Sequence, residues 1–261
     1  MNHMIIDTHI HLDGEEFAAD LDEVVARAKQ AGVGKMLLPA IDANTTDAVE
    51  TLSNRLKGYA YPMIGLHPEE VRNDWREVLG LLRPRVGAPF VAIGEVGLDF
   101  YWSREYEQEQ MEAFEEQVKW SIETRLPLMI HCRKAQNEMV TIMRRYKNDL
   151  PGGVFHCFTG NEIEAAQLLD FRNFVIGIGG VLTFKKSNLP RVLPTIPLSR
   201  IVLETDAPYM APVPMRGKRN ESSFLGYVVE KMAEVYQIDP KEVRQQTTAN
   251  ACRVFRIDLT D

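Results

Sequence analysis

Met4-Ile-Ile-Asp-Thr-His-Ile-His11 is the stretch that decides how the rest of the chain folds. An apolar run followed by regularly spaced polar residues is typical of a buried strand with a functional end. Side chains two residues apart on a strand point the same way, so we expect His9 and His11 to face one metal ion. For this motif alone, two ordinary histidines near a strand end are the alternative.

Other apolar runs also end in an imidazole or a carboxylate: Ile64-Gly-Leu-His67, Ile93-Gly-Glu95, Met129-Ile-His131, Phe155-His156 and Leu203-Glu-Thr-Asp206. The carboxyl ends of parallel strands meet on one rim of a barrel, where such side chains converge. A single buried His is ordinarily a hydrogen-bonded core residue, and a single strand-end Glu is ordinarily ion-paired. It is improbable that His, Glu and Asp residues stand at so many strand ends by chance, so the pattern favours a metal site.

Short apolar runs alternate with amphipathic stretches along the whole chain, which predicts an α/β fold, a (β/α)8 TIM barrel in a single domain over residues 1–261. The predicted strands lie near residues 4–8, 35–40, 59–66, 90–95, 127–131, 153–157, 174–179 and 200–205. Crossover helices are expected at 15–31 and 105–124, and extra C-terminal helices at 222–236 and 240–255.

The seventh crossover, near residues 187–193, is poorly helical and has two prolines nearby. An open, doubly wound sheet is the alternative architecture, and it would also place strand-end residues along one edge. It would not bring the first and eighth strands together. His9, His11 and Asp206 need that closure to form one site.

Net charge and composition restrict the partners. A net charge of −7 argues against broad, charge-driven binding of nucleic acid, although bound divalent ions would reverse the local field at a cleft. No stretch approaches ~18 uninterrupted apolar residues and no leader precedes Met4, so we expect a cytoplasmic protein with no membrane span. The cysteines, Cys132, Cys157 and Cys252, form no CxxC pair, which predicts reduced thiols and no structural tetrathiolate zinc site.

Histidines combined with carboxylates suit a borderline or hard dication, and Zn, Mg, Mn and Ni all remain open. Our hypothesis is that one ion is held by His9, His11, Glu95 and Asp206, and a second by Glu95, His131 and His156. Two ions about 4 Å apart can activate water and stabilise a leaving alkoxide. Asp206 is then the candidate general base, and Glu95 the bridging carboxylate.

With these residues in place, the chain resembles the TatD family of metal-dependent hydrolases, within the amidohydrolase superfamily. The resemblance covers nearly the whole length and rests on Asp7-Thr-His-Ile-His-Leu-Asp13, Gly65-Leu-His-Pro68, Gly94-Glu-Val-Gly-Leu-Asp99, His131-Cys-Arg133, Phe155-His-Cys-Phe-Thr-Gly160, Leu203-Glu-Thr-Asp-Ala-Pro-Tyr209 and Arg216-Gly-Lys-Arg-Asn-Glu221. It implies a closed barrel and deoxyribonuclease activity, often 3′→5′ on single-stranded DNA. It also implies a binuclear site at His9, His11, Glu95, His131, His156 and Asp206.

Other residues are candidates for substrate contacts. The resemblance gives His67 a substrate or leaving-group role, and packing against Pro68 is its alternative. Arg133 can form a fork onto a phosphate or pair with a nearby carboxylate. Glu204 lies two residues before Asp206 and can orient a ligand or a water, or pair with a basic residue in the barrel wall.

The stretch at residues 210–221 carries Arg216, Lys218 and Arg219 and predicts a loop over the barrel mouth. Its cations suit a phosphate backbone, and a solvated charged loop is the alternative for each one. The candidate stacking aromatics are Trp102, Phe158, Phe184 and Tyr209.

A few residues depart from the family pattern. Glu69 stands where many relatives have a second His, and Ser222 stands where Pro is usual. Cys132 and Lys134 replace the more common Ser and Asp. We expect Cys132 and Cys157 to point away from the site along their strands, as packing residues.

Two other functions remain open. A binuclear site also suits hydrolysis of an amide, a lactone or an ester such as aminoacyl-tRNA. Glu95 argues against the subgroup of the superfamily that bridges its metals with a carbamylated lysine. A catalytically inactive metal-binding scaffold is the lesser alternative. Nothing in the sequence indicates an obligate protein partner.

Overall fold

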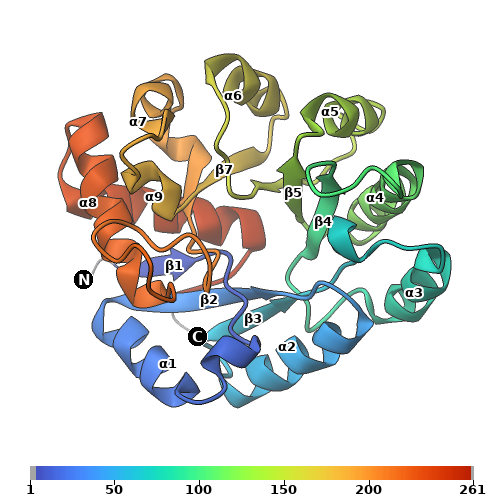
Figure 1. Ribbon diagram of the computed structural model, residues 1–261, viewed down its shortest axis with the longest axis horizontal. Coiled ribbons are helices and arrows are strands. Elements are labelled where there is room, and N and C mark those ends of the chain that lie inside the picture. Colours follow the sequence, from blue (N-terminus) through green and yellow to red (C-terminus); the bar gives the residue numbers. More distant parts are fainter. Residues whose placement is uncertain (1–3, 260–261) are drawn as a thin grey trace.

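Strands and helices alternate along the chain in the computed structural model, which describes residues 4–259 (Figure 1). The strands are β1 (Ile5–Asp7), β2 (Val33–Pro39), β3 (Ala60–Met63), β4 (Ile93–Asp99), β5 (Leu128–Arg133), β6 (Gly153–Phe155), β7 (Phe174–Ile178) and β8 (Ile201–Leu203). The helices are α1 (Leu21–Gln30), α2 (Ala43–Arg55), α3 (Trp75–Leu82), α4 (Glu107–Thr124), α5 (Gln136–Arg144), α6 (Glu162–Leu169), α7 (Leu189–Val192), α8 (Leu225–Tyr236) and α9 (Pro240–Phe255).

The strands pair in parallel with their neighbours in chain order, β1 to β3 in one sheet and β4 to β8 in another. An isolated bridge between Ile64 and Ile93 connects the two sheets on one side. On the other side, the Thr8 amide donates a 3.0 Å hydrogen bond to the Leu203 carbonyl, so β1 lies beside β8. The predicted (β/α)8 barrel is confirmed, and it brings the first and last strands together.

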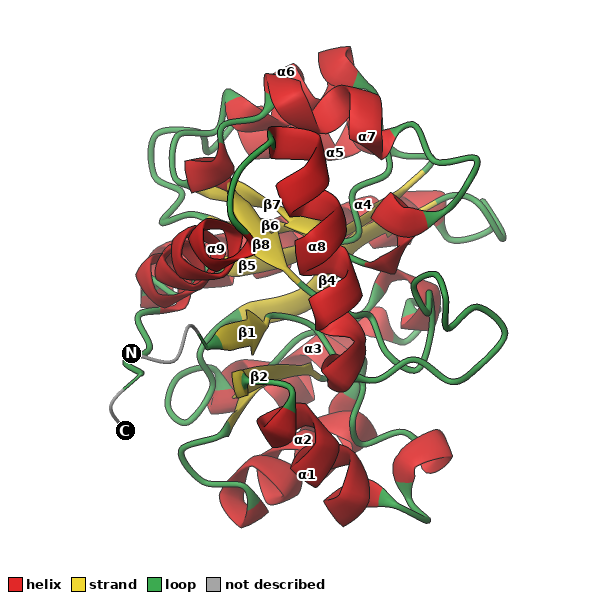
Figure 2. Ribbon diagram, turned by 90° about the vertical axis from the view of Figure 1, so that its left-hand side faces the viewer, coloured by secondary structure: helices red, strands yellow, loops and turns green. Residues whose placement is uncertain are grey.

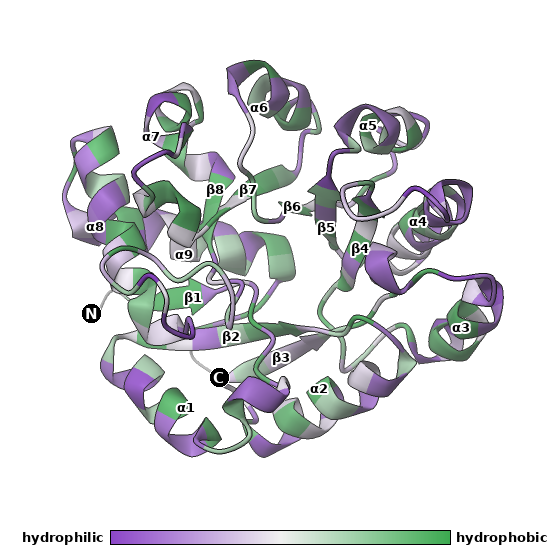
Figure 3. Ribbon diagram, viewed as in Figure 1, coloured by the Kyte–Doolittle hydropathy of each residue, from purple (hydrophilic) through white to green (hydrophobic). Residues whose placement is uncertain are grey.

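The barrel interior and the inward faces of the helices are apolar, whereas the outer helix faces are polar (Figure 3). On α4, Phe114 and Val118 are fully buried, as the helical spacing predicts. The same helix buries two glutamines. The Gln110 side chain accepts a 2.9 Å hydrogen bond from the Asp99 amide, and Gln117 accepts one of 2.7 Å from Leu66. These bonds fix the chain at the mouth of the barrel.

The fourth strand differs from the prediction, because it continues four residues past Glu95 to Asp99. The glycines around Glu95 weaken the strand pattern, yet they are what allows the pairing. Gly97 has a φ of +146°, and a Cβ there would overlap the carbonyl oxygen of His131 on β5. Glu95 therefore lies within a strand rather than at its end.

Several predicted helices are shorter than expected. The first crossover begins as a 3₁₀ turn at Glu15–Phe17 before α1, and the predicted helix at 222–236 begins as a 3₁₀ turn at Ser222–Phe224. The seventh crossover contains only the four-residue α7 between short 3₁₀ turns, as its prolines indicate.

Helix α9 matches its prediction and lies across the amino-terminal ends of β1 and β8 (Figure 2). The Asn250 side chain donates hydrogen bonds to the carbonyls of Leu198 and Ile201, which bracket the start of β8. Thr248 donates to Met4 O ahead of β1. Within residues 4–259 no helix combines the length and apolar character needed to cross a membrane.

Candidate metal centre

Glu95 lies at the centre of a cluster of imidazoles and is only 3% exposed. Its two carboxylate oxygens face different histidines. Oε2 lies 3.1 Å from His9 Nε2 and 3.6 Å from His11 Nε2. Oε1 lies 2.9 Å from His131 Nδ1 and 3.6 Å from His156 Nε2. One carboxylate thus stands between two pairs of nitrogen donors.

Asp206 completes this cluster from the end of β8. Its Oδ1 lies 3.7 Å from His11 Nε2 and 3.6 Å from His156 Nε2. The turn that carries it is held against β1, because the Asp206 amide donates a 2.9 Å hydrogen bond to the His9 carbonyl. The structure therefore brings together all six residues predicted as metal ligands.

These imidazole nitrogens and carboxylate oxygens are suitable ligands for a divalent metal ion. His9 Nε2 and His11 Nε2 lie 3.3 Å apart. Burial lowers the pKa of His9 well below its usual value and that of His11 to about 4, so both rings are neutral at pH 7. Neutral imidazole nitrogens that converge beside a buried carboxylate are what Zn²⁺ and similar ions require. A cation between them would satisfy lone pairs that otherwise face one another.

Glu204 lies on the Nδ1 side of the His156 ring, opposite the Nε2 that faces Glu95. Its Oε2 lies 3.1 Å from His156 Nδ1, and its Oε1 accepts a 2.5 Å hydrogen bond from the Cys157 amide. Burial lowers the pKa of His156, but the charges of Glu204, Asp206 and Glu95 outweigh burial and raise it to about 10. A carboxylate on Nδ1 directs the Nε2 lone pair toward a metal.

Asp99 plays the same part for His131 and was missed by the sequence analysis. Its Oδ2 lies 2.9 Å from His131 Nε2, while the other ring nitrogen faces Glu95. Burial lowers the pKa of His131, but hydrogen bonds to these two carboxylates raise it to about 9. The available signal was the spacing of Glu95 and Asp99, because residues four apart on a strand share one face.

His67 lies beside this cluster but is bonded differently. Its Nε2 is 3.4 Å from Glu95 Oε1, and its Nδ1 accepts a 3.1 Å hydrogen bond from the Glu69 amide. A neutral imidazole that accepts at Nδ1 carries its proton on Nε2. The side of His67 that faces the site is therefore a donor and not a free lone pair.

Asp7 is a second residue that the sequence analysis did not assign to the site. It is fully buried, accepts hydrogen bonds from the Thr205 amide at 3.0 Å and hydroxyl at 2.7 Å, and accepts another from the Ser222 hydroxyl at 2.6 Å. Burial raises its pKa to about 6. Asp7 ties β1 to the end of β8, and Ser222, a departure from the family pattern, supplies one of its donors. The signal was its spacing, two residues before His9.

The predicted cations at the barrel mouth lie in different environments. The Arg133 guanidinium stacks 3.7 Å from the Tyr101 ring centroid, and that of Arg216 lies 3.9 Å from the Phe184 centroid. Arg219 instead donates two hydrogen bonds, of 2.7 and 2.8 Å, to the Asp20 carboxylate.

The prediction that the Cys157 side chain points away from the site is wrong. Strand β6 ends at Phe155, and Cys157 adopts a left-handed backbone with a φ of +48°. Its thiol therefore lies within 4.8 Å of ligand atoms of His156 and Glu204 instead of pointing away along a strand. Burial and the nearby carboxylates raise the pKa of the thiol well above its usual value, so it stays protonated.

A parallel barrel with imidazoles and carboxylates converging at the carboxyl ends of its strands defines the class of metal-dependent barrel hydrolases. The family profile described as TatD related DNase matches residues 6–256. The chain therefore belongs to the TatD family.

Sequence similarity to known proteins supports this assignment, and it extends over their whole length. The chain is 38% identical to the uncharacterized metal-dependent hydrolase YabD of Bacillus subtilis, with 98% of this chain and 100% of that protein covered. It is 36% identical to the 3′-5′ ssDNA/RNA exonuclease TatD of Yersinia pseudotuberculosis, with 97% and 100% covered. The crystal structure of YjjV, a TatD homologue from Escherichia coli K12, superposes with a TM-score of 0.90 at 30% identity and covers 99% of this chain and 100% of its own.

Proposed function

We propose that this protein is a nuclease that removes nucleotides from the 3′ end of single-stranded DNA, with two divalent ions held on either side of Glu95. The observation that carries the proposal is the division of the histidines between the two Glu95 oxygens. One ion would be held by His9, His11, Asp206 and Oε2, and the other by His131, His156 and Oε1. The name of the Yersinia relative, a 3′-5′ ssDNA/RNA exonuclease, supports the substrate and the polarity.

Bound divalent ions supply Lewis acidity, which acidifies water and offsets charge on phosphoryl oxygens. The residues around them have separate tasks. Asp206, at the rim beside His11 and His156, is placed to accept a proton from the attacking water. His67 carries its proton on Nε2, so it is placed to form a hydrogen bond that stabilises the developing charge on the departing oxygen.

The barrel mouth suits a flexible polyanion with exposed bases. Trp102 is 68% exposed, and its ring centroid lies 5.1 Å from the Arg133 guanidinium. Tyr209 is also exposed, whereas Phe158 is buried and unavailable for stacking. Exposed aromatic rings next to guanidinium groups are typical of single-strand binding sites, where rings stack on bases and cations contact phosphates.

The test is a 5′-labelled single-stranded oligonucleotide incubated with metal-free protein and with protein plus Mg, Mn, Zn or Ni. Asp206→Ala is the test variant, and Asp149→Ala, at an exposed position, is the matched control. We expect a ladder that shortens with time only in the presence of metal, in the wild type and the control but not in Asp206→Ala. Intact oligonucleotide under every metal would overturn the proposal. Two bound ions without cleavage would direct the search to ester, lactone, amide and aminoacyl-tRNA substrates.

A further inference from the structure

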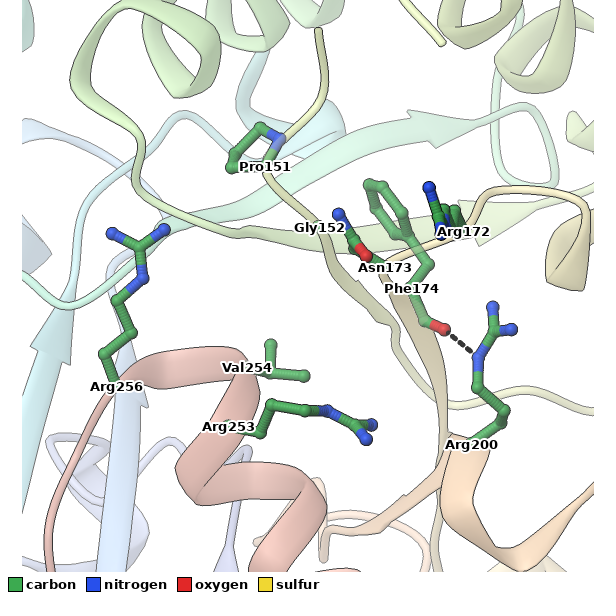
Figure 4. Close-up of a pocket in the computed structure, with 9 residues that line it drawn as sticks. All are labelled: Pro151, Gly152, Arg172, Asn173, Phe174, Arg200, Arg253, Val254 and Arg256. Carbon is green, nitrogen blue, oxygen red and sulfur yellow. Dashed lines mark hydrogen bonds between the residues drawn. The ribbon is translucent and has the colours of Figure 1, made fainter. Parts of the chain in front are cut away.

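A cavity of about 240 Å³ opens at the end of the barrel opposite the metal centre (Figure 4). Its lining includes Gly152, Asn173 and Arg200, which immediately precede β6, β7 and β8 respectively. The metal centre lies at the carboxyl ends of these strands. The five residues of β7 span about 16 Å at the usual rise per residue, which separates the two sites.

Four arginines from three segments line this cavity: Arg172, Arg200, Arg253 and Arg256. Figure 4 shows their guanidinium groups distributed around it. Within residues 4–259 none of the four forms an ion pair with a carboxylate. Arginines on the flanks of the barrel commonly do, for example Arg83 with Glu123 and Arg85 with Glu50.

Part of the cluster has a structural role. Arg200 donates to the backbone carbonyl oxygens of Phe174 at 2.6 Å and Phe171 at 2.8 Å, and Arg253 donates to Ser199 O at 3.0 Å. Burial, and after it the charge of Arg253, lowers the pKa of Arg200. The cluster stores an unfavourable like-charge interaction that a bound anion would relieve.

The other two arginines lack such hydrogen bonds within residues 4–259. Arg172 and Arg256 are exposed, and neither guanidinium has a hydrogen-bond or ion-pair partner in the described part of the chain. Asp258 lies two residues after Arg256 but does not pair with it. Their donors are therefore available to a ligand.

We propose that this cavity binds inorganic phosphate or a phosphate monoester through Arg172, Arg253 and Arg256, with Arg200 beside them. Planar guanidinium groups bind phosphate oxygens in pairs, and a dianion opposes more than one cation. The volume equals that of about eight water molecules, so the cavity has room for an organic group attached to the phosphate. The site does not depend on the reaction at the metal centre.

The test is calorimetric titration of the full-length, metal-loaded protein with inorganic phosphate and with deoxyadenosine 5′-monophosphate in 0.15 M NaCl. The test variant is Arg172→Gln/Arg256→Gln, which removes two exposed guanidinium groups that form no hydrogen bond or ion pair within residues 4–259. The matched control is Arg125→Gln/Arg144→Gln, which removes two other exposed cations. Any phosphate that binds at the metal centre does so equally in the wild type, the test variant and the control, so it does not affect the comparison. Equal melting temperatures would confirm that all three proteins are folded.

We expect one binding event to weaken by at least about tenfold in the test variant and to be unchanged in the control, since loss of a charged hydrogen bond to the ligand weakens binding by about tenfold or more. Tighter binding of the nucleotide than of phosphate would show that the organic group also contacts the cavity. Identical titrations of the wild type and the test variant would overturn the proposal. An equal loss in the control would also overturn it, because it would reduce the effect to net charge.

Discussion

Replacing Glu204 by glutamine tests whether this carboxylate directs His156 toward the metal. Glu204 is 1% exposed, and its Oε1 accepts a hydrogen bond from the Cys157 amide while its Oε2 lies 3.1 Å from His156 Nδ1. Glutamine has nearly the same shape but only one acceptor. Whichever way its amide is oriented, one buried N–H group loses its acceptor and faces another donor.

The expected size of the effect follows from this loss. An unsatisfied buried donor costs about 1–3 kcal/mol. If the loss falls on His156, affinity for metal should fall about 10- to 100-fold, the usual range for a residue that orients a ligand. If it falls on the Cys157 amide, the free energy of unfolding should fall by a similar energy instead. We therefore predict the sum of two losses, the loss in free energy of metal binding and the loss in free energy of unfolding.

The assay is competition for Zn²⁺ between the purified protein and a chromophoric chelator, combined with denaturant unfolding of the metal-free protein. Glu230→Gln removes an exposed carboxylate and serves as the control. Wild-type metal affinity together with wild-type stability in Glu204→Gln would refute the assignment, because neither buried donor would then depend on the second oxygen.

Three further outcomes are expected. His67→Gln should lower kcat by about 10²- to 10³-fold, the range for loss of a hydrogen bond to developing negative charge, while elemental analysis shows an unchanged metal content; a loss of metal would instead make His67 a ligand. The hydrogen bonds from Arg219 lower the pKa of Asp20 to about 2, below its ordinary 3.8. Its contribution to stability is therefore complete above about pH 4 and lost as the pH falls toward 2, and Asp20→Asn should flatten this part of a plot of urea midpoint against pH. Ser222→Ala removes a 2.6 Å donor to buried Asp7 and should lower the free energy of unfolding by about 1–3 kcal/mol, as measured by denaturant titration. A stability equal to the wild type would show that Asp7 finds another donor.

The sequence predicted the barrel because apolar periodicity is set locally, by which residues face inward. It predicted that the imidazoles and carboxylates converge for a related reason, since parallel strands bring their carboxyl ends together whatever their length. Glu95 shows the limit of this argument. The flanking glycines weaken the strand signal, and only the approach of β5 to Gly97 shows that β4 continues beyond Glu95.

Contacts between distant segments were beyond prediction. Arg219 pairs with Asp20, which lies 199 positions earlier in the chain, and no local pattern connects the two. Cys157 was misplaced because its direction depends on a left-handed backbone that a strand pattern does not anticipate. In both cases the outcome is set by tertiary packing around the barrel rim and not by the spacing of neighbours in sequence.

The distribution of charge matters more for function than the net charge of −7. Carboxylates, including the buried Glu95 and Glu204 and the partly exposed Asp206, gather at the carboxyl ends of the strands. Without bound cations this rim would repel a phosphodiester, and two dications would reverse the sign of its field. The opposite end of the barrel carries four arginines that form no ion pair with a carboxylate within residues 4–259. If the proposed function holds, metal binding at this rim precedes binding of a polyanion, whereas the anion site proposed at the arginine cavity requires no metal.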